Sequence, residues 1–250
     1  RRVFYTALLA GALNVAAAQP EGYMFGRQLL IDGSKIAGPG VLTDFPLLVS
    51  ITLPDLRTVA NGGQLRSSSA FDVLFTLGDC GTVLPYQRER YVASTGEFIA
   101  WVKVPQLNPG ADMPIHMYYG RTSVPPDPST TAVWDANYRG VWHFNNSVAD
   151  ASGTGNNLTS TSTANINSGK IGQGRDLNNS SNINSNNSGR HLRMPNGVLS
   201  GVTNFTFEGW VSLDRYQTNW ERIFDFGTNT TRNFFFTPTT ASGTPAQTRV

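Results

Sequence analysis

Residues 97–104 read Glu-Phe-Ile-Ala-Trp-Val-Lys-Val, and this stretch decides the fold of the first half of the chain. Successive side chains of a β-strand point to opposite faces, so Phe98, Ala100, Val102 and Val104 would share one face. The stretch therefore predicts a strand with one face in a core. Apart from the amino-terminal leader, no segment of eleven or more residues shows a clean helical period.

Similar short apolar runs flank this stretch at residues 45–51, 70–76 and 114–120. Turn-forming residues separate them, and the chain contains 25 Gly and 14 Pro. The pattern predicts an all-β chain built from antiparallel sheets, with a β-sandwich as the expected form of this half.

The second half repeats the strand pattern after a polar tract. In residues 205–213, Phe205, Phe207, Val211 and Leu213 alternate with polar residues and Trp210, which predicts a half-buried strand. Residues 219–227 and 233–237 predict the next two strands. Residues 151–190 consist mostly of Asn, Ser, Thr and Gly, and such a tract predicts long loops around one or two short strands.

An amino-terminal leader and a proline cluster indicate the boundaries between the parts of the chain. Arg1 and Arg2 precede an apolar run and Ala16-Ala17-Ala18, as in a secretory signal peptide, with Sec and twin-arginine export both open. Three prolines in residues 125–128 favour an extended boundary. The predicted parts are a signal peptide at 1–18, a first module at 19–128, a connector at 129–138 and a second module at 139–250.

The first module resembles the bacterial extracellular family DUF2341. The resemblance rests on residues 43–49, 71–76, 84–91, 96–105 and 115–120. Members of that family often precede a laminin-G-like domain in large secreted or surface proteins, and no catalytic activity is established for them. The resemblance therefore implies a location and a tandem architecture, without a reaction.

The second module resembles the opening half of a laminin-G-like (concanavalin-A-like lectin/glucanase) jelly roll. The resemblance rests on residues 140–146, 150–153, 169–177, 204–211 and 220–227. A full domain of this kind needs more chain than remains, so we expect an incomplete module. The resemblance implies a second antiparallel β-sandwich that binds glycans or proteins outside the cell.

The charge and the cysteine content exclude several functions and kinds of site. The formal net charge is +2, and Arg1 and Arg2 supply both units, so a mature chain would be neutral and nucleic-acid binding is not expected. Cys80 is the only cysteine, which excludes an internal disulfide and a cysteine-based zinc site. No membrane span is expected in the mature chain.

The laminin-G resemblance implies a structural Ca²⁺, which oxygen ligands hold. Asp150, with Asn156 and Asn157 nearby, is the best candidate for such a site. The alternative is that Asp150 caps its own loop in an Asx turn.

A pair of catalytic carboxylates is not expected. A glycosidase needs two carboxyl groups across the scissile bond. Glu221 and Asp225, with Glu208 as a third member, lack the closely spaced acidic motif of concanavalin-like glucanases. Glu89 and Glu97 form the other pair, and Glu89 lies between Arg88 and Arg90 as in a solvated charge patch. His116 and His143 are expected to be packed or hydrogen-bonded.

Exposed aromatic rings could stack on sugars, and Trp220 with Tyr216 is the predicted pair, whereas most other Trp residues are expected in the core. The expected function is a non-catalytic, secreted or cell-surface binding or adhesion module of a bacterium. Its expected partner is an extracellular glycan or a surface protein. The alternatives are an accessory carbohydrate-binding region of a larger polysaccharide-acting enzyme and a structural spacer of a surface protein.

Overall fold

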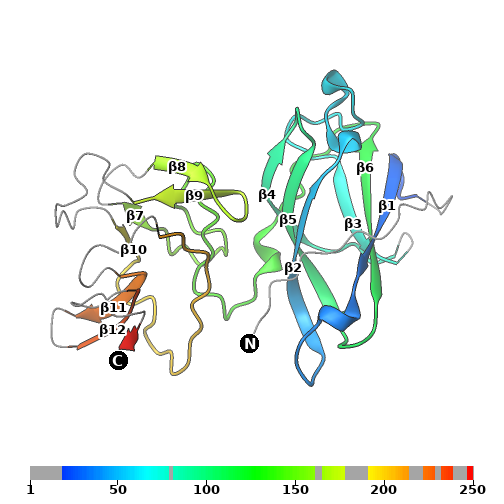
Figure 1. The fold of residues 1–250 in the computed structure, drawn as a ribbon. Helices are drawn as coiled ribbons and strands as arrows, with labels where there is room; N and C mark the ends of the chain where they lie inside the picture. The colour runs from blue at the N-terminus through cyan, green and yellow to red at the C-terminus, as the bar shows by residue number, and fades with distance from the viewer. Residues whose placement is uncertain are drawn as a thin grey trace. The chain divides into compact units, whose positions relative to one another are not determined.

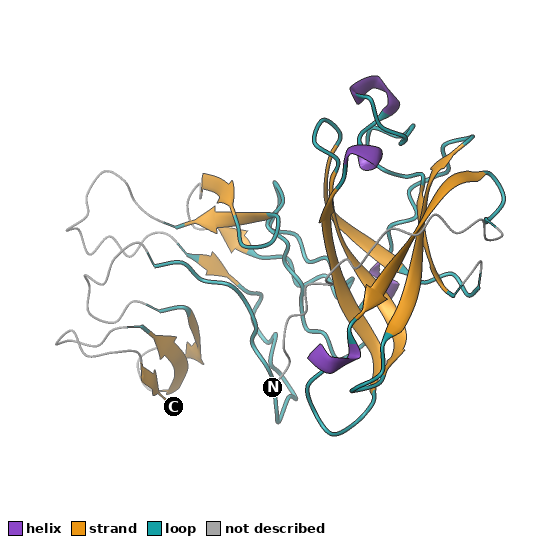
Figure 2. Cartoon of the chain, turned by 45° about the vertical axis from the view of Figure 1, so that its right-hand side comes forward, coloured by secondary structure: helices purple, strands orange, loops and turns teal. Residues whose placement is uncertain are grey.

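The computed structural model describes residues 19–78, 81–160, 165–177, 191–213, 222–228, 232–238 and 247–249. These residues form β-strands, turns and short 3₁₀ helices, with no α-helix among them (Figure 2). The all-β prediction is confirmed, and the strands form several small antiparallel sheets. Within the described ranges, no helix has the length and apolar character needed to cross a bilayer.

Contacts divide the chain into two compact units. The first contains the described residues up to Leu177 together with His191–Ser200, and the second contains those from Gly201 onward. The predicted signal peptide lies outside the described residues.

Two three-stranded antiparallel sheets begin the first unit (Figure 1). One has the order β1-β6-β3, and the other has the order β2-β5-β4. The strands are β1 (Tyr23–Ile31), β2 (Leu42–Thr52), β3 (Val73–Leu77), β4 (Tyr86–Val92), β5 (Glu97–Leu107) and β6 (Met113–Arg121). Short 3₁₀ helices lie between strands at η1 (Gly33–Lys35), η2 (Pro54–Leu56) and η3 (Val59–Asn61). The predicted strands at 45–51, 97–104 and 114–120 are confirmed, and the strand predicted at 70–76 begins at Val73.

All six strands contribute side chains to one hydrophobic core. Phe98, Ala100, Val102 and Val104 are all fully buried in it, as the alternation in residues 97–104 predicts. The ring of Phe75 on β3 lies 5.1 Å from that of Tyr86 on β4 and 6.2 Å from that of Phe98 on β5, measured between centroids. Burying one such side chain contributes about 1.5–3 kcal/mol, so this core is the main source of stability in the unit.

The β4–β5 hairpin requires glycine at its turn. Gly96 has φ of +75°, and a Cβ at this position would lie 2.0 Å from the carbonyl oxygen of Leu53. Only glycine accommodates both the left-handed backbone and the close approach. The turn sets the register of β4 on β5, and that register positions the outer face described below.

The remainder of the first unit consists of short elements. After η4 (Thr131–Val133), two two-stranded ladders form from β7 (Thr159–Ser160) with β10 (Leu192–Arg193) and from β8 (Asn165–Ser168) with β9 (Gln173–Asp176). Three of these strands lie within the polar tract and β10 follows it, so the tract contains more short strands than the one or two predicted.

The second unit contains one sheet with the order β11-β12-β13, formed by β11 (Phe224–Thr228), β12 (Arg232–Thr237) and β13 (Gln247–Arg249). Its strands confirm the predictions at 219–227 and 233–237 in their described parts. Phe224 lies opposite Phe236, and Phe226 lies opposite Phe234. Phe205 and Phe207 pack on these rings, with centroids 5.4 Å and 4.8 Å from Phe226 and Phe224.

The strand predicted at residues 205–213 is absent. These residues form no ladder with any described strand, and the side chain of Trp210 is 57% exposed. Alternating apolar residues are compatible with a strand, but a strand also requires a neighbour for its backbone hydrogen bonds. The alternation alone therefore did not predict whether the segment pairs.

Candidate functional site

A β-bulge in β4 turns the side chain of Glu89 towards protein. Arg88 pairs with Ala100 and Arg90 pairs with Ile99, so Glu89 is an extra residue without its own partner on β5. A bulge redirects side chains locally. The side chain of Glu89 is only 4% exposed, whereas Arg88 pairs with Asp127 and Arg90 pairs with Glu97. The prediction that Glu89 belongs to a solvated charge patch is therefore wrong.

Glu89 belongs to a polar and aromatic cluster on the outer face of β4 and β5. The Glu89 cluster consists of Gln87, Glu89, Trp101, Trp134 and His143. Trp101 donates its Nε1–H to Glu89 Oε2 at 2.7 Å, and His143 Nδ1 lies 3.1 Å from the same oxygen. Trp134 donates to Gln87 Oε1 at 2.7 Å, and the two indole rings lie 5.5 Å apart. The cluster therefore joins two strands to residues that follow the proline boundary.

His143 has an acceptor at each ring nitrogen. Nδ1 faces Glu89 Oε2, and Nε2 faces Gln87 Oε1 at 2.8 Å. The amide of Gln87 has a fixed orientation because it accepts from Trp134 through Oε1 and donates to the carbonyl of Ala151 through Nε2 at 2.8 Å. Both contacts of His143 are hydrogen bonds only when both ring nitrogens carry protons. Through these two contacts His143 bridges Glu89 and Gln87.

Residues 129–158, here called the covering segment, pack on the outer face of β4 and β5. Thr130 donates its N–H to the carbonyl of Tyr86 at 2.9 Å, and Ser129 accepts from the N–H of Arg88 at 3.0 Å. Asn145 donates to the carbonyl of Glu89, so the bulged residue is fixed through both its backbone and its side chain. The histidine prediction is confirmed for His143, which is packed and hydrogen-bonded.

The turn at Gly172 completes the enclosure of Glu89. Gly172 has φ of +55°, and a Cβ there would lie 2.7 Å from Glu89 Oε1 and 3.3 Å from Asn145 Oδ1. The carboxylate is thus covered by a residue without a side chain. The Glu89 cluster has its polar groups directed at one another, and this arrangement favours holding the chain together over chemistry on a substrate.

Asp150 is the centre of a second hydrogen-bonded loop. Its Oδ1 accepts from backbone N–H groups at 2.9 and 2.8 Å, and its Oδ2 accepts from a hydroxyl at 2.7 Å and an N–H at 3.0 Å. The donors are Val141 and Ser152 for Oδ1, and Thr154 and Asn156 for Oδ2. The backbone N–H of Asp150 donates to Asn157 Oδ1 at 2.8 Å. The structure therefore brings the three predicted residues together.

These hydrogen bonds set the charge state of Asp150. Partial burial alone would raise its pKa, but hydrogen bonds from Thr154, Val141 and Ser152 outweigh burial and lower the pKa to about 2. The carboxylate is ionised at neutral pH, and N–H and O–H donors of the protein stabilise its negative charge.

The donor set around Asp150 does not fit a calcium ion well. Calcium needs several oxygen ligands that point at the ion. Here both carboxylate oxygens face N–H and O–H donors, and the amide nitrogen of Asn156 donates to the carbonyl of Arg139 at 2.7 Å. No group of three His, Cys, Asp or Glu residues suited to a metal occurs in the described part of the chain. The geometry favours the Asx-turn alternative, and calcium binding stays a prediction.

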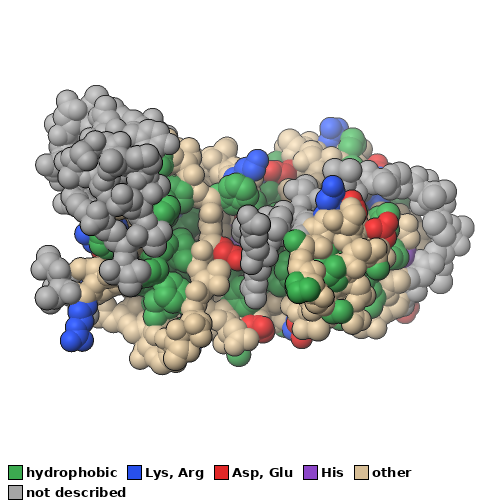
Figure 3. Space-filling view, turned by 60° about the horizontal axis from the view of Figure 1, so that its bottom comes forward, with side chains coloured by type: hydrophobic (Ala, Val, Ile, Leu, Met, Phe, Trp, Pro, Cys, Tyr) green, Lys and Arg blue, Asp and Glu red, His purple; other side chains and the backbone are tan. Residues whose placement is uncertain are grey.

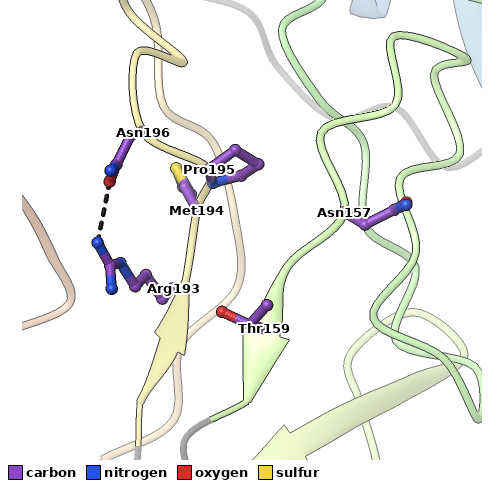
Figure 4. Close-up of a pocket in the computed structure, with 6 residues that line it drawn as sticks. All are labelled: Asn157, Thr159, Arg193, Met194, Pro195 and Asn196. Carbon is purple, nitrogen blue, oxygen red and sulfur yellow. Dashed lines mark hydrogen bonds between the residues drawn. The ribbon is translucent and has the colours of Figure 1, made fainter.

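A pocket of about 310 Å³ opens beside the β7–β10 ladder (Figure 4). Its lining combines exposed polar side chains with two half-buried apolar ones. The lining residues are Asn157, Thr159, Arg193, Met194, Pro195 and Asn196. Concave sites with an apolar surface and a few polar groups are typical ligand sites, and this volume is at the lower end of their range.

Sequence reasoning missed this pocket. It forms because β7 and β10 pair across the polar tract, with Thr159 opposite Arg193 and Ser160 opposite Leu192. Each strand has only two residues, which is too short for a periodic signal.

The predicted sugar-stacking pair, Trp220 and Tyr216, lies outside the described residues, as does Glu221. Of the other predicted acidic residues, Asp225 pairs with Arg222, and Glu208 is exposed. Glu97 accepts from Arg90 at 2.9 Å. Asp225 and Glu97 thus have basic partners. On the face in Figure 3, charged side chains are few and scattered among uncharged ones.

Comparison with known proteins identifies one family. Residues 69–155 match the domain of unknown function DUF2341. The prediction that the chain contains a DUF2341 domain is confirmed, but the match ends at residue 155, beyond the predicted boundary at 128. It includes β3–β6, the Glu89 cluster and the Asp150 carboxylate. Neither a curated protein nor a solved structure matches the chain. None of the comparisons supports a laminin-G-like second domain.

Proposed function

We propose that this chain is a non-catalytic binding module of a secreted or cell-surface protein, with an extracellular glycan as its ligand. In this proposal the first module is a β-sandwich, and the second is a laminin-G-like jelly roll. The all-β fold and the DUF2341 match at residues 69–155 support the proposal, because the resemblance to that family implies a place in large secreted or surface proteins.

The observation that carries the proposal is the pocket beside β7 and β10. Its surface is mainly apolar, and Met194 and Pro195 offer such a surface to a ring face, while the exposed lining residues Thr159, Asn196 and Arg193 carry groups that can bond to sugar hydroxyls. Sugars present both kinds of surface, so a site of mixed character suits them.

The state of the acidic residues supports binding without catalysis. Hydrolysis of a glycosidic bond needs one carboxyl group as an acid and a second as a nucleophile or base. Glu89, Glu97 and Asp150 are each engaged by protein donors. None of the residues lining the pocket is acidic.

The covering segment favours a second candidate function, that of a structural spacer. Its anchoring to β4 and β5 fixes residues 129–158 where a flexible linker would leave them free. A spacer needs such stiffness and no ligand. The alternative of an accessory region in a larger polysaccharide-acting enzyme also implies a glycan ligand. It differs from the proposal only in requiring a catalytic domain elsewhere in the whole protein.

A glycan-array screen of residues 19–250, in the presence of calcium and then of EDTA, tests the proposal. We expect binding to at least one glycan class. The double variant Thr159→Val, Asn196→Ala should lose that binding, because it removes a hydroxyl and an amide from the pocket. The matched control Thr203→Val, Asn204→Ala changes exposed residues elsewhere and should bind as the unmodified chain does. No binding to any glycan would leave the spacer function.

A further inference from the structure

Arg193 brings an unneutralised charge to the pocket. Its Nη2 donates to Asn196 Oδ1 at 2.9 Å (Figure 4). A guanidinium has five N–H donors in a fixed fork, so this contact orients the group and leaves most of its donors available. Among the described residues, no carboxylate pairs with Arg193, in contrast to Arg88 and Arg90.

The neighbouring polar groups can also donate. Thr159 is directly opposite Arg193 in the ladder, which places both side chains on one face. The amide of Asn196 accepts from Arg193 through its oxygen, so its nitrogen remains a donor. Guanidinium, hydroxyl and amide groups around one pocket match a ligand rich in acceptor oxygens.

The charge of the pocket selects among such ligands. A neutral sugar would use the hydroxyl and amide groups but would leave the positive charge of Arg193 without a counter-charge. A carboxylate or sulfate group accepts two parallel N–H bonds from one guanidinium, and such charge-assisted bonds are about twice as strong as neutral ones.

We infer that the ligand is an acidic saccharide, bound through a carboxylate or sulfate group on Arg193 while Met194 and Pro195 contact its ring. This inference rests on the proposed glycan-binding function and names the class of glycan. Because the polar groups are exposed, the contact should weaken as salt is added.

Isothermal titration calorimetry on residues 19–250 tests the inference with three probes of similar length. These are an oligogalacturonate with carboxylates, a sulfated chondroitin oligosaccharide and a neutral xylo-oligosaccharide. We expect at least one acidic probe to bind about tenfold or more tightly than the neutral probe, as one charge-assisted contact allows.

Variants of two arginines complete the test. Arg193→Gln should reduce the affinity for the acidic probe about tenfold and that for the neutral probe much less, because only the acidic probe loses a charge-assisted contact, whereas Arg193→Lys should retain part of the acidic preference. Arg66→Gln removes the same charge from an exposed site in the first module and should change neither affinity.

The outcomes separate the two proposals. Equal affinity for acidic and neutral probes, or equal effects of Arg193→Gln and Arg66→Gln, would overturn the acidic ligand and leave glycan binding intact. If no saccharide of any class binds, the glycan-binding function itself fails. Preference between carboxylate and sulfate probes would identify the anionic group.

Discussion

The Glu89 cluster and the β7–β10 pocket contain similar side chains, but those of the cluster bond to one another whereas those of the pocket have unused hydrogen-bond donors. Gln87 and Asn196 are both amides that contact a nitrogen-bearing side chain, His143 and Arg193, but the amide of Gln87 has protein partners at both ends, and that of Asn196 has one. Glu89 is buried against Trp101 and His143, whereas Arg193 is exposed and has no carboxylate partner in the described part of the chain. Groups whose hydrogen bonds are complete stabilise the fold, and groups with spare donors are available to a ligand.

This difference separates variants that affect stability from variants that affect binding. Changes in the Glu89 cluster should lower the free energy of unfolding, because each leaves a buried group without a partner or creates a cavity. Changes in the pocket should leave stability nearly unchanged.

The largest effect is expected for Trp134→Ala. Trp134 is 8% exposed, packs on Trp101 and bonds to Gln87, so its removal leaves a large cavity under the covering segment. We expect a loss of about 3–5 kcal/mol, measured by urea denaturation. The pocket variant Asn196→Ala should lose less than about 0.5 kcal/mol. Equal losses would show that the two regions do not differ as proposed.

Gly172→Ala should have the next largest effect. The added methyl group would approach Glu89 Oε1 to 2.7 Å, on a backbone with φ of +55°. The left-handed conformation costs about 1–2 kcal/mol for a non-glycine residue, and crowding adds to it, so we expect a loss of about 3 kcal/mol. Gly155→Ala is the control for the conformation alone, because a Cβ at Gly155, with φ of +80°, meets no atom within 4 Å. Thermal melting of both variants isolates the contact with Glu89.

Glu89→Gln tests the contact between Glu89 and His143 with little change in shape. The variant keeps an oxygen for Trp101 but loses the negative charge that faces His143, and we expect a loss of about 2 kcal/mol. Glu97→Gln is the matched control, since Glu97 forms a partly exposed pair with Arg90 and should lose at most about 1 kcal/mol. If urea midpoints for the two variants coincide, the enclosure of Glu89 has no energetic consequence.

The sequence predicted those features that depend on local alternation. β5 was predicted correctly because Phe98, Ala100, Val102 and Val104 alternate regularly and are buried on one face. Glu89 was misread because a bulge depends on how β4 aligns with β5, which the stretch Arg88-Glu89-Arg90 does not encode. The pocket was missed for a related reason, since it forms only when residues on both sides of the polar tract pair.

The smallest effect is expected at Asp150, where the pH dependence distinguishes a hydrogen-bonded loop from a metal site. The pKa of Asp150 is lowered to about 2, so its ionised form stabilises the folded state above the unfolded pKa of about 3.9. That stabilisation is lost as pH falls through 2. Because the loop is partly exposed, we expect Asp150→Asn to lose about 1 kcal/mol at pH 6, and this difference should shrink as pH approaches 2.

Urea denaturation at pH 6, 4 and 3 measures this dependence, and Glu208→Gln, at an exposed residue, should show none of it. The same samples test the metal. Because N–H and O–H donors occupy both oxygens of Asp150, EDTA should not shift the midpoint of the unmodified chain. A calcium ion bound there would stabilise the folded state in proportion to its concentration, so a midpoint that rises with calcium in the unmodified chain but not in Asp150→Asn would establish the metal site and contradict the hydrogen-bonded loop.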